Sequence, residues 1–209
     1  MRKILIPAAA LIAIAGGSVL IAQAPTAAPG SKDATKVTGG TYTIDGGHTQ
    51  IVFAYDHMGF TNNMGVIAMP TGTLTLDPKA PAAAKVSVDI PVANLKTGVP
   101  KLDEHLMKPD FFDSAKFPTA KFVSTGVKPE GATGAEITGN LTIKGVTKPV
   151  TLDAEFYGAG KAPAMMGGKE NVGFVATGTI KRSDFGMGYG VPMVGDAIEL
   201  KIIAGFVKQ

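Results

Sequence analysis

The sequence predicts an all-β fold, an eight-stranded antiparallel up-and-down barrel with a short helical insertion near residues 100–113. The clearest signal is at residues 137–156, where apolar and polar residues alternate on both sides of a turn at 145–149. This pattern is typical of a β-hairpin with one apolar face. Other segments alternate in the same way, and only the insertion changes to a helical period. Consecutive antiparallel strands in even number can close on themselves, which removes exposed strand edges.

Three strands precede the insertion. The first covers residues 41–59 and is broken at 45–47, because a glycine pair inside a strand usually marks a bulge or bend. Beyond the break, Phe53, Tyr55 and His57 share one face. The second and third strands are expected at residues 65–77 and 85–92.

The period changes at residues 100–113, since Leu102 and Leu106 stand four positions apart and Pro109 stops the segment. This is typical of a helix of about two turns. Farther along, the glycine- and methionine-rich residues 157–168 predict a flexible loop. The remaining strands are expected at residues 119–128, 137–144, 150–156, 171–181 and 196–208.

The N-terminal residues predict export. Two basic residues, an apolar run at 4–21 and a small-residue sequence at 22–24 form the pattern of a secretory signal peptide over residues 1–24. The alternative is an uncleaved anchor, since about 18 apolar residues just span a bilayer. Residues 25–40 are small, polar and rich in Pro and Gly, which predicts a disordered tether. The folded domain then covers residues 41–209.

Composition argues against several functional classes. The absence of cysteine argues against disulfides, a lipoprotein anchor and a thiol nucleophile. Of 20 basic residues, Arg2 and Lys3 belong to the expected signal, which leaves 18 against 17 acidic residues, so nucleic acid is not an expected partner. His48, His57 and His105 lie on different segments without metal-ligand spacing, and no catalytic motif is present. We therefore expect no enzymatic activity, no metal and no cofactor.

Strand alternation assigns the side chains that face the interior. A barrel of this size is just wide enough to be filled by its own side chains or to hold one slim ligand, and the residue pattern leaves both alternatives open. Phe112 and the helix are expected to plug or flank one opening, because neither can be absorbed into a strand. The candidate ligand-binding residues are Phe53, Tyr55, His57, Phe112, Leu141, Ile143, Leu152 and Phe156.

Several motifs, in order along the chain, resemble the signatures of the YceI-like family. They are Y-T-I-D at 42–45 with His48, Phe53 and His57; D-E-H-L at 103–106 with D-F-F-D at 110–113 and F-P at 117–118; G-N-L-T-I-K-G-V-T-K-P-V-T-L at 139–152; and R-S-D-F-G at 182–186. The resemblance covers residues 41–209. It departs at Leu102, where the family commonly has Arg, and at Tyr189, where Trp is frequent. If the Arg of the family meets an anionic head group, the departure at Leu102 bears on which head group a ligand would carry.

The resemblance implies an extended lipocalin-like barrel in the bacterial periplasm that holds a long isoprenoid-type lipid, polyprenyl or quinone-like. The residue pattern alone reaches the closed barrel and export, but not the ligand. The rival hypothesis is a barrel with a filled core that acts as a protein-interaction or stress-response module without ligand. A homodimer, and membrane proximity through the N-terminal segment, stay open.

Overall fold

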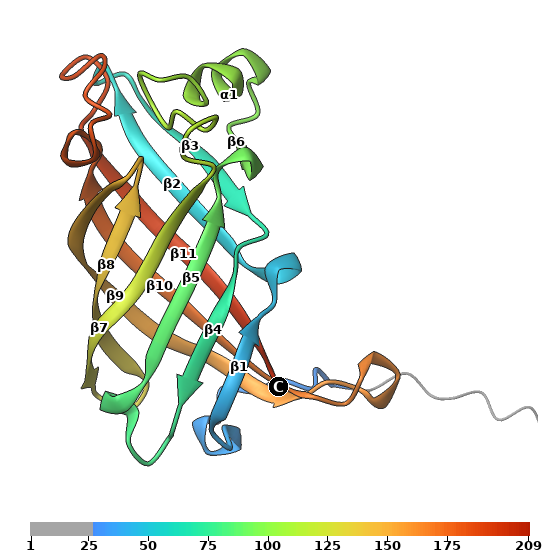
Figure 1. Ribbon diagram of the computed structural model, residues 1–209. Helices are drawn as coiled ribbons and strands as arrows, with labels where there is room; N and C mark the ends of the chain where they lie inside the picture. Colours follow the sequence, from blue (N-terminus) through green and yellow to red (C-terminus); the bar gives the residue numbers. More distant parts are fainter. Residues whose placement is uncertain (1–26) are drawn as a thin grey trace, which may run out of the picture.

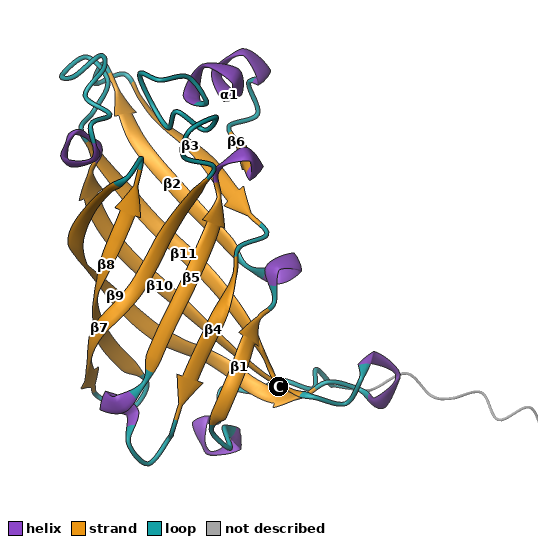
Figure 2. Cartoon of the chain, viewed as in Figure 1, coloured by secondary structure: helices purple, strands orange, loops and turns teal. Residues whose placement is uncertain are grey.

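The computed structural model describes residues 27–209 and confirms a closed, eight-stranded antiparallel β-barrel (Figure 1). The strands are β1 (Gly40–Ile44), β2 (Gln50–His57), β3 (Thr61–Ala68), β4 (Thr71–Leu76), β5 (Lys85–Pro91), β6 (Leu95–Lys96), β7 (Thr119–Glu130), β8 (Gly134–Ile143), β9 (Val146–Lys161), β10 (Glu170–Lys181) and β11 (Ala197–Lys208). The helical segments are η1 (Ala34–Lys36), η2 (Gly46–His48), η3 (Pro81–Ala83), η4 (Val92–Asn94), α1 (Pro100–Leu106), η5 (Ala164–Met166) and η6 (Arg182–Phe185). Figure 2 shows strands forming the wall, with most of the helical segments near its two ends.

The barrel closes because the first and last strands pair. Eight of these strands form the closed ring, in the order β1-β4-β5-β7-β8-β9-β10-β11. The last of them, β11, pairs back with β1, where Tyr42 faces Lys208 and Ile44 faces Phe206. β2 continues along β11 beyond β1, with Phe53 opposite Leu200. The first predicted strand is therefore β1 and β2, and the second is β3 and β4.

The predicted break in the first strand is a bend held by hydrogen bonds to β11. The backbone N–H of Asp45 donates to the carbonyl of Gly205 at 2.8 Å, and the Gly205 N–H donates to the hydroxyl of Thr49 at 3.0 Å. Gly46 is required here because a Cβ would lie 2.8 Å from the Pro70 carbonyl oxygen. The break between β1 and β2 therefore lies against the break between β3 and β4, where Pro70 is located.

The insertion lies at the end of the barrel drawn uppermost in Figure 1, called the upper end below. Its helix spans Pro100–Leu106, about two turns as predicted, and the residues after it form turns. Asp103 fixes the start of the helix by accepting hydrogen bonds from the backbone N–H and the hydroxyl of Thr97, both at 2.7 Å. Pro109 ends the helical pattern because it lacks a backbone donor.

The predicted disordered tether at 25–40 is wrong where the structure describes it beyond residue 30. Ser31 pairs with Ala159 of β9, with backbone hydrogen bonds of 3.0 and 2.9 Å, and Val37 is buried among the side chains of the lower end. We call residues 31–39 the N-terminal arm. Its composition is loop-like, but partners on β9 and β10 order it. The predicted signal peptide at 1–24 lies outside the described residues.

The predicted loop at 157–168 is wrong over residues 157–161, which belong to β9, whereas residues 162–168 do lie in the connection between β9 and β10. The glycines leave room for the chain before β1. A Cβ at Gly160 would overlap the carbonyl oxygen of Pro29, and one at Gly158 would lie 3.1 Å from that of Ser31. These glycines therefore allow close approach of two backbones.

A buried carboxylate joins the N-terminal arm to the barrel. Glu170 accepts hydrogen bonds from the Tyr42 hydroxyl at 2.6 Å and from the backbone N–H and hydroxyl of Thr38 at 3.0 and 2.6 Å. Burial and then the bond to Glu170 raise the pKa of Tyr42 to about 12. Burial alone raises the pKa of Glu170, but the hydrogen bonds from Thr38 and Tyr42 outweigh it and hold that pKa below its ordinary value. Glu170 is therefore ionised and satisfied within the fold.

Within residues 27–209, no helix is long and apolar enough to cross a membrane.

Candidate ligand-binding cavity

The inside of the barrel is hollow. Two cavities occupy it, one of about 360 Å³ toward the lower end and one of about 320 Å³ toward the upper end. We call them the lower and upper chambers. They share lining side chains at mid-height, namely Ile51, Ile90, Leu141 and Leu200. Native cores contain few voids larger than a water molecule, so spaces of this size are a feature of the fold and not a packing defect.

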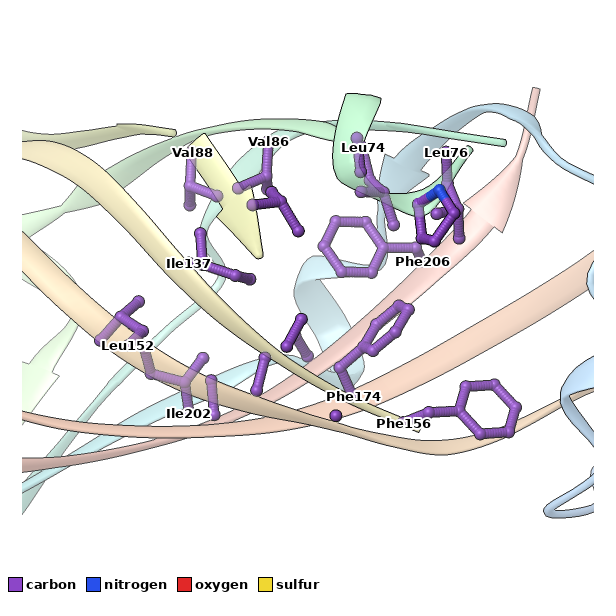
Figure 3. A pocket seen from close by; sticks show the side chains of 18 of the residues that line it. Leu74, Leu76, Val86, Val88, Ile137, Leu152, Phe156, Phe174, Ile202 and Phe206 are labelled. Carbon is purple, nitrogen blue, oxygen red and sulfur yellow. The ribbon is translucent and has the colours of Figure 1, made fainter. Parts of the chain in front are cut away.

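The lower chamber is almost entirely apolar. Figure 3 shows aliphatic and aromatic side chains from many strands around it, among them Phe156, Phe174 and Phe206. The ring centroid of Phe174 lies 6.0 Å from that of Phe156 and 6.2 Å from that of Phe206, in edge-to-face geometry. Among its lining residues, only Thr49, Lys85 and Thr133 have polar side chains. Such a surface suits a hydrocarbon chain.

The upper chamber combines apolar walls with polar groups gathered toward its end. His105, Phe111 and Tyr189 form an aromatic cluster, with ring centroids 5.1, 5.8 and 5.9 Å apart. The helix α1 contributes Leu102, His105 and Leu106 to the wall. The polar side chains that line this chamber are Tyr55, His57, Asn63, His105, Arg182 and Tyr189.

Arg182 is buried and organises the loop between β10 and β11. Its Nε donates to the carbonyl of Gly195 at 2.8 Å, and Nη2 donates to that of Val194 at 2.7 Å. Nη1 donates to the carbonyls of Tyr189, at 2.8 Å, and Met187. Burial lowers the pKa of Arg182, while the charge of Asp196 acts in the opposite direction. Four backbone carbonyls thus compensate a buried cation beside the chamber.

The sequence-predicted site residues all line the interior. Phe53, Tyr55, His57, Phe112 and Ile143 line the upper chamber. Leu152 and Phe156 line the lower chamber, and Leu141 lines both. Their part in binding a ligand stays a prediction.

Other lining residues escaped the sequence prediction. Phe174 and Phe206 lie at alternating positions of β10 and β11, where the pattern does not separate a core residue from a cavity residue. Arg182 and Tyr189 lie beyond the end of β10, where alternation gives no information. For these two, the only sequence signal is their place in or near the R-S-D-F-G motif.

The histidines do not form a metal centre. His57 and His105 line the upper chamber, whereas His48 is exposed and contacts Asp45 at 2.8 Å. Across residues 27–209, no cluster of three or more His, Asp or Glu side chains is arranged to hold a metal ion.

Comparison with known proteins identifies the family. Residues 42–206 match the YceI-like domain. The chain belongs to the YceI-like family. A UPF0312 protein of Pseudomonas putida strain W619 is 41% identical over 170 residues, which cover 80% of this chain and 86% of that protein. A UPF0312 protein of Pseudomonas fluorescens strain SBW25 is 39% identical over 178 residues, covering 84% and 91%.

Several solved structures have a fold similar to this barrel. Burkholderia cenocepacia BcnA aligns with a TM-score of 0.68 at 25% identity, covering 78% of this chain and 98% of BcnA. A Campylobacter jejuni YCEI protein aligns with a TM-score of 0.65 at 32% identity, covering 74% and 90%. A polyisoprenoid-binding domain from Saccharophagus degradans has a TM-score of 0.60 at 11% identity, covering 80% and 98%, which is a likeness of fold alone.

Proposed function

We propose that this protein is a carrier and not an enzyme, and that it holds one long isoprenoid-type lipid, polyprenyl or quinone-like, inside the barrel. The observation that carries the proposal is the pair of apolar chambers, of about 360 and 320 Å³, which share wall residues at mid-height. A barrel filled by its own side chains would leave no such space. The rival module with a filled core is therefore the weaker hypothesis.

The polarity of the two chambers supports one orientation of the lipid. A polar head group in the lower chamber would lose its hydration for few partners, because only Thr49, Lys85 and Thr133 of the lining side chains are polar, and an unpaired polar group costs several kcal/mol. The upper chamber offers donors and acceptors on His57, Asn63 and His105. The tail therefore lies in the lower chamber and the head at the upper end, beside the aromatic cluster. Leu102 and Tyr189, where the chain departs from the family pattern, both line this end.

Export is part of the proposal. The basic start and the apolar run at 4–21 support secretion to the periplasm, where a lipid carrier would move cargo through water. The Saccharophagus degradans domain is described as polyisoprenoid-binding, which supports the ligand class through likeness of fold.

Native mass spectrometry of the exported protein from its host tests the proposal. We expect a mass above that of the chain, and the excess mass should be released as lipid on denaturation. Titration of the delipidated protein with prenyl lipids of increasing length should give affinity that rises with length until the chambers are full, because each buried methylene contributes about 0.8 kcal/mol. A clean chain mass with no uptake of prenyl lipids or quinones would contradict the carrier.

A further inference from the structure

The β9–β10 hairpin extends past the barrel wall at its lower end and ends in an exposed apolar tip (Figure 1). Met165 and Met166 are 91% and 72% exposed, and Tyr157 on the same hairpin is 67% exposed. No residue of η5, which forms the tip, is buried. Packing within the barrel therefore does not explain these side chains.

The tip has a defined shape. The backbone N–H of Ala162 donates to the carbonyl of Lys169 at 2.9 Å, and the N–H groups of Met166 and Gly168 donate to that of Pro163 at 2.8 and 3.2 Å. Two adjacent thioether side chains are thus held in solvent by a closed turn. Exposed apolar side chains fixed in this way indicate an interaction surface.

Charge around the tip is positive. Lys161 and Lys169 flank it on the two strands, and residues 157–169 contain no carboxylate. Lys32 and Lys36 add to the positive charge of this end, against Asp33 in the N-terminal arm and the buried, ionised Glu170. An apolar tip between basic side chains is the pattern of a segment that inserts shallowly into an anionic lipid surface.

The chain length between Ser31 and the apolar N-terminal run limits how far that run can lie from the hairpin. Ser31 pairs with β9 beside the hairpin, and only residues 22–30 separate it from the run at 4–21. At roughly 3.3–3.6 Å per extended residue, these nine residues reach about 30 Å. If that run stays in a membrane as an uncleaved anchor, the hairpin of the folded barrel is within reach of the same membrane surface.

We propose that the tip of the β9–β10 hairpin docks the barrel onto an anionic bilayer. Met165 and Met166 enter the head-group region, and Lys161 and Lys169 meet lipid phosphates. A protein partner fits less well, because a stable interface buries about 800 Å² on each side, far more than the side chains of this tip supply. The upper rim also exposes Phe60 and Met193, but Asp56 near the end of β2, and Asp184 and Asp196 between β10 and β11, add carboxylates that an anionic surface repels.

Vesicle co-sedimentation tests the docking surface. The test uses residues 27–209, because every strand of the closed barrel and its pairing lie within them. The protein should bind phosphatidylcholine vesicles that contain phosphatidylglycerol, bind pure phosphatidylcholine far less, and dissociate as salt rises. The double variant Met165→Ser with Met166→Ser should bind at least about tenfold more weakly. The double variant Lys161→Gln with Lys169→Gln should also bind more weakly, and its binding should depend less on salt.

The matched control is Phe60→Ser with Met193→Ser, which removes two exposed apolar side chains from the opposite end. It should bind vesicles as the parent does, and all variants should keep the parent melting temperature within a few degrees because each changed side chain is exposed. Unchanged binding by the methionine variant would overturn the proposal. So would loss of binding by the upper-rim control alone, or a parent protein that ignores anionic vesicles.

Discussion

Two buried charged side chains each hold a segment without regular strand structure against the barrel, one at each end. Arg182 gathers four backbone carbonyls of the loop between β10 and β11 at the upper end. Glu170 accepts bonds from Thr38 and Tyr42 at the lower end. Buried charges are tolerated only when such partners compensate them. Each is therefore a point where one substitution should act on a whole segment.

Arg182→Lys should destabilise the protein by about 2–4 kcal/mol, because an ammonium cannot reach four carbonyls arranged around a planar guanidinium. Urea unfolding followed by circular dichroism measures the change in the free energy of unfolding. Lys181→Met, at the exposed neighbouring position, is the control and should lie within about 0.5 kcal/mol of the parent. Equal stability of the Arg182→Lys variant would show that the carbonyls find other partners.

Glu170→Gln should lower stability in a pH-dependent way. Because the pKa of Glu170 in the folded state lies below its ordinary value of 4.5, its contribution is fully present above that value. It is lost as pH falls through the folded-state pKa. We expect a deficit of about 1–3 kcal/mol at pH 7 that narrows at pH 3, measured by urea unfolding at both pH values. Glu155→Gln, at an exposed position of β9, is the control; a deficit that does not change with pH would refute the assignment.

The sequence does not predict that these two charged side chains are buried, whereas it does predict which side chains of the wall point inward. Alternation places Phe53, Leu141 and Leu152 correctly because a strand fixes side-chain direction locally. Glu170 and Arg182 are polar, and a polar residue at a strand end is ordinarily solvent-exposed. Their burial depends on partners that only the closed barrel supplies, such as Tyr42, which is 128 positions from Glu170 in the chain.

At the scale of elements, the N-terminal arm and the β9–β10 hairpin depend on each other. The sequence predicts two flexible segments, since both are rich in small residues and glycine. In the structure they order one another, because glycine in β9 lets the backbone at Pro29 and Ser31 approach. Composition alone does not distinguish a glycine that permits flexibility from one that permits contact.

Gly160→Val should release the N-terminal arm without unfolding the barrel. The valine side chain would occupy the space of the Pro29 carbonyl, while β9 keeps its pairing with β8 and β10. Limited proteolysis should cut the variant within residues 27–40 well before the parent, at nearly unchanged melting temperature. Gly188→Val is the control, since a Cβ there meets nothing within 4 Å. Identical cleavage of the Gly160→Val variant and the parent would contradict the mutual ordering.

At the scale of the whole molecule, the barrel wall is continuous, while the two chambers inside it differ in the polarity of their lining side chains. The lower chamber is lined almost entirely by apolar side chains, whereas the upper chamber also offers polar groups. Sequence alternation predicts the wall and its inner face, because both follow from a period of two. It does not predict the volume left inside, because that depends on how side chains from opposite walls meet.

Leu141→Trp tests whether the interior is a tunnel, since Leu141 lines both chambers. If the chambers hold lipid, the larger ring should fill shared space and abolish uptake of a long-chain quinone, with little change in melting temperature. If the interior is a packed core, the same overpacking should destabilise by about 1–3 kcal/mol, and the parent should take up no quinone. Asn140→Trp, which points outward from β8, is the control for both measurements.

The pairing of β1 with β11 has a consequence for the order of folding. Ile44 must meet Phe206 before the ring is complete, and contacts this distant in sequence form slowly because a long loop must first be closed. While β11 is still missing, β1 and β10 each keep an unpaired edge. A chain made or threaded through a translocation channel from its N-terminus therefore cannot lock into the finished barrel early. The closure that surrounds the two chambers therefore waits for the last strand of the chain.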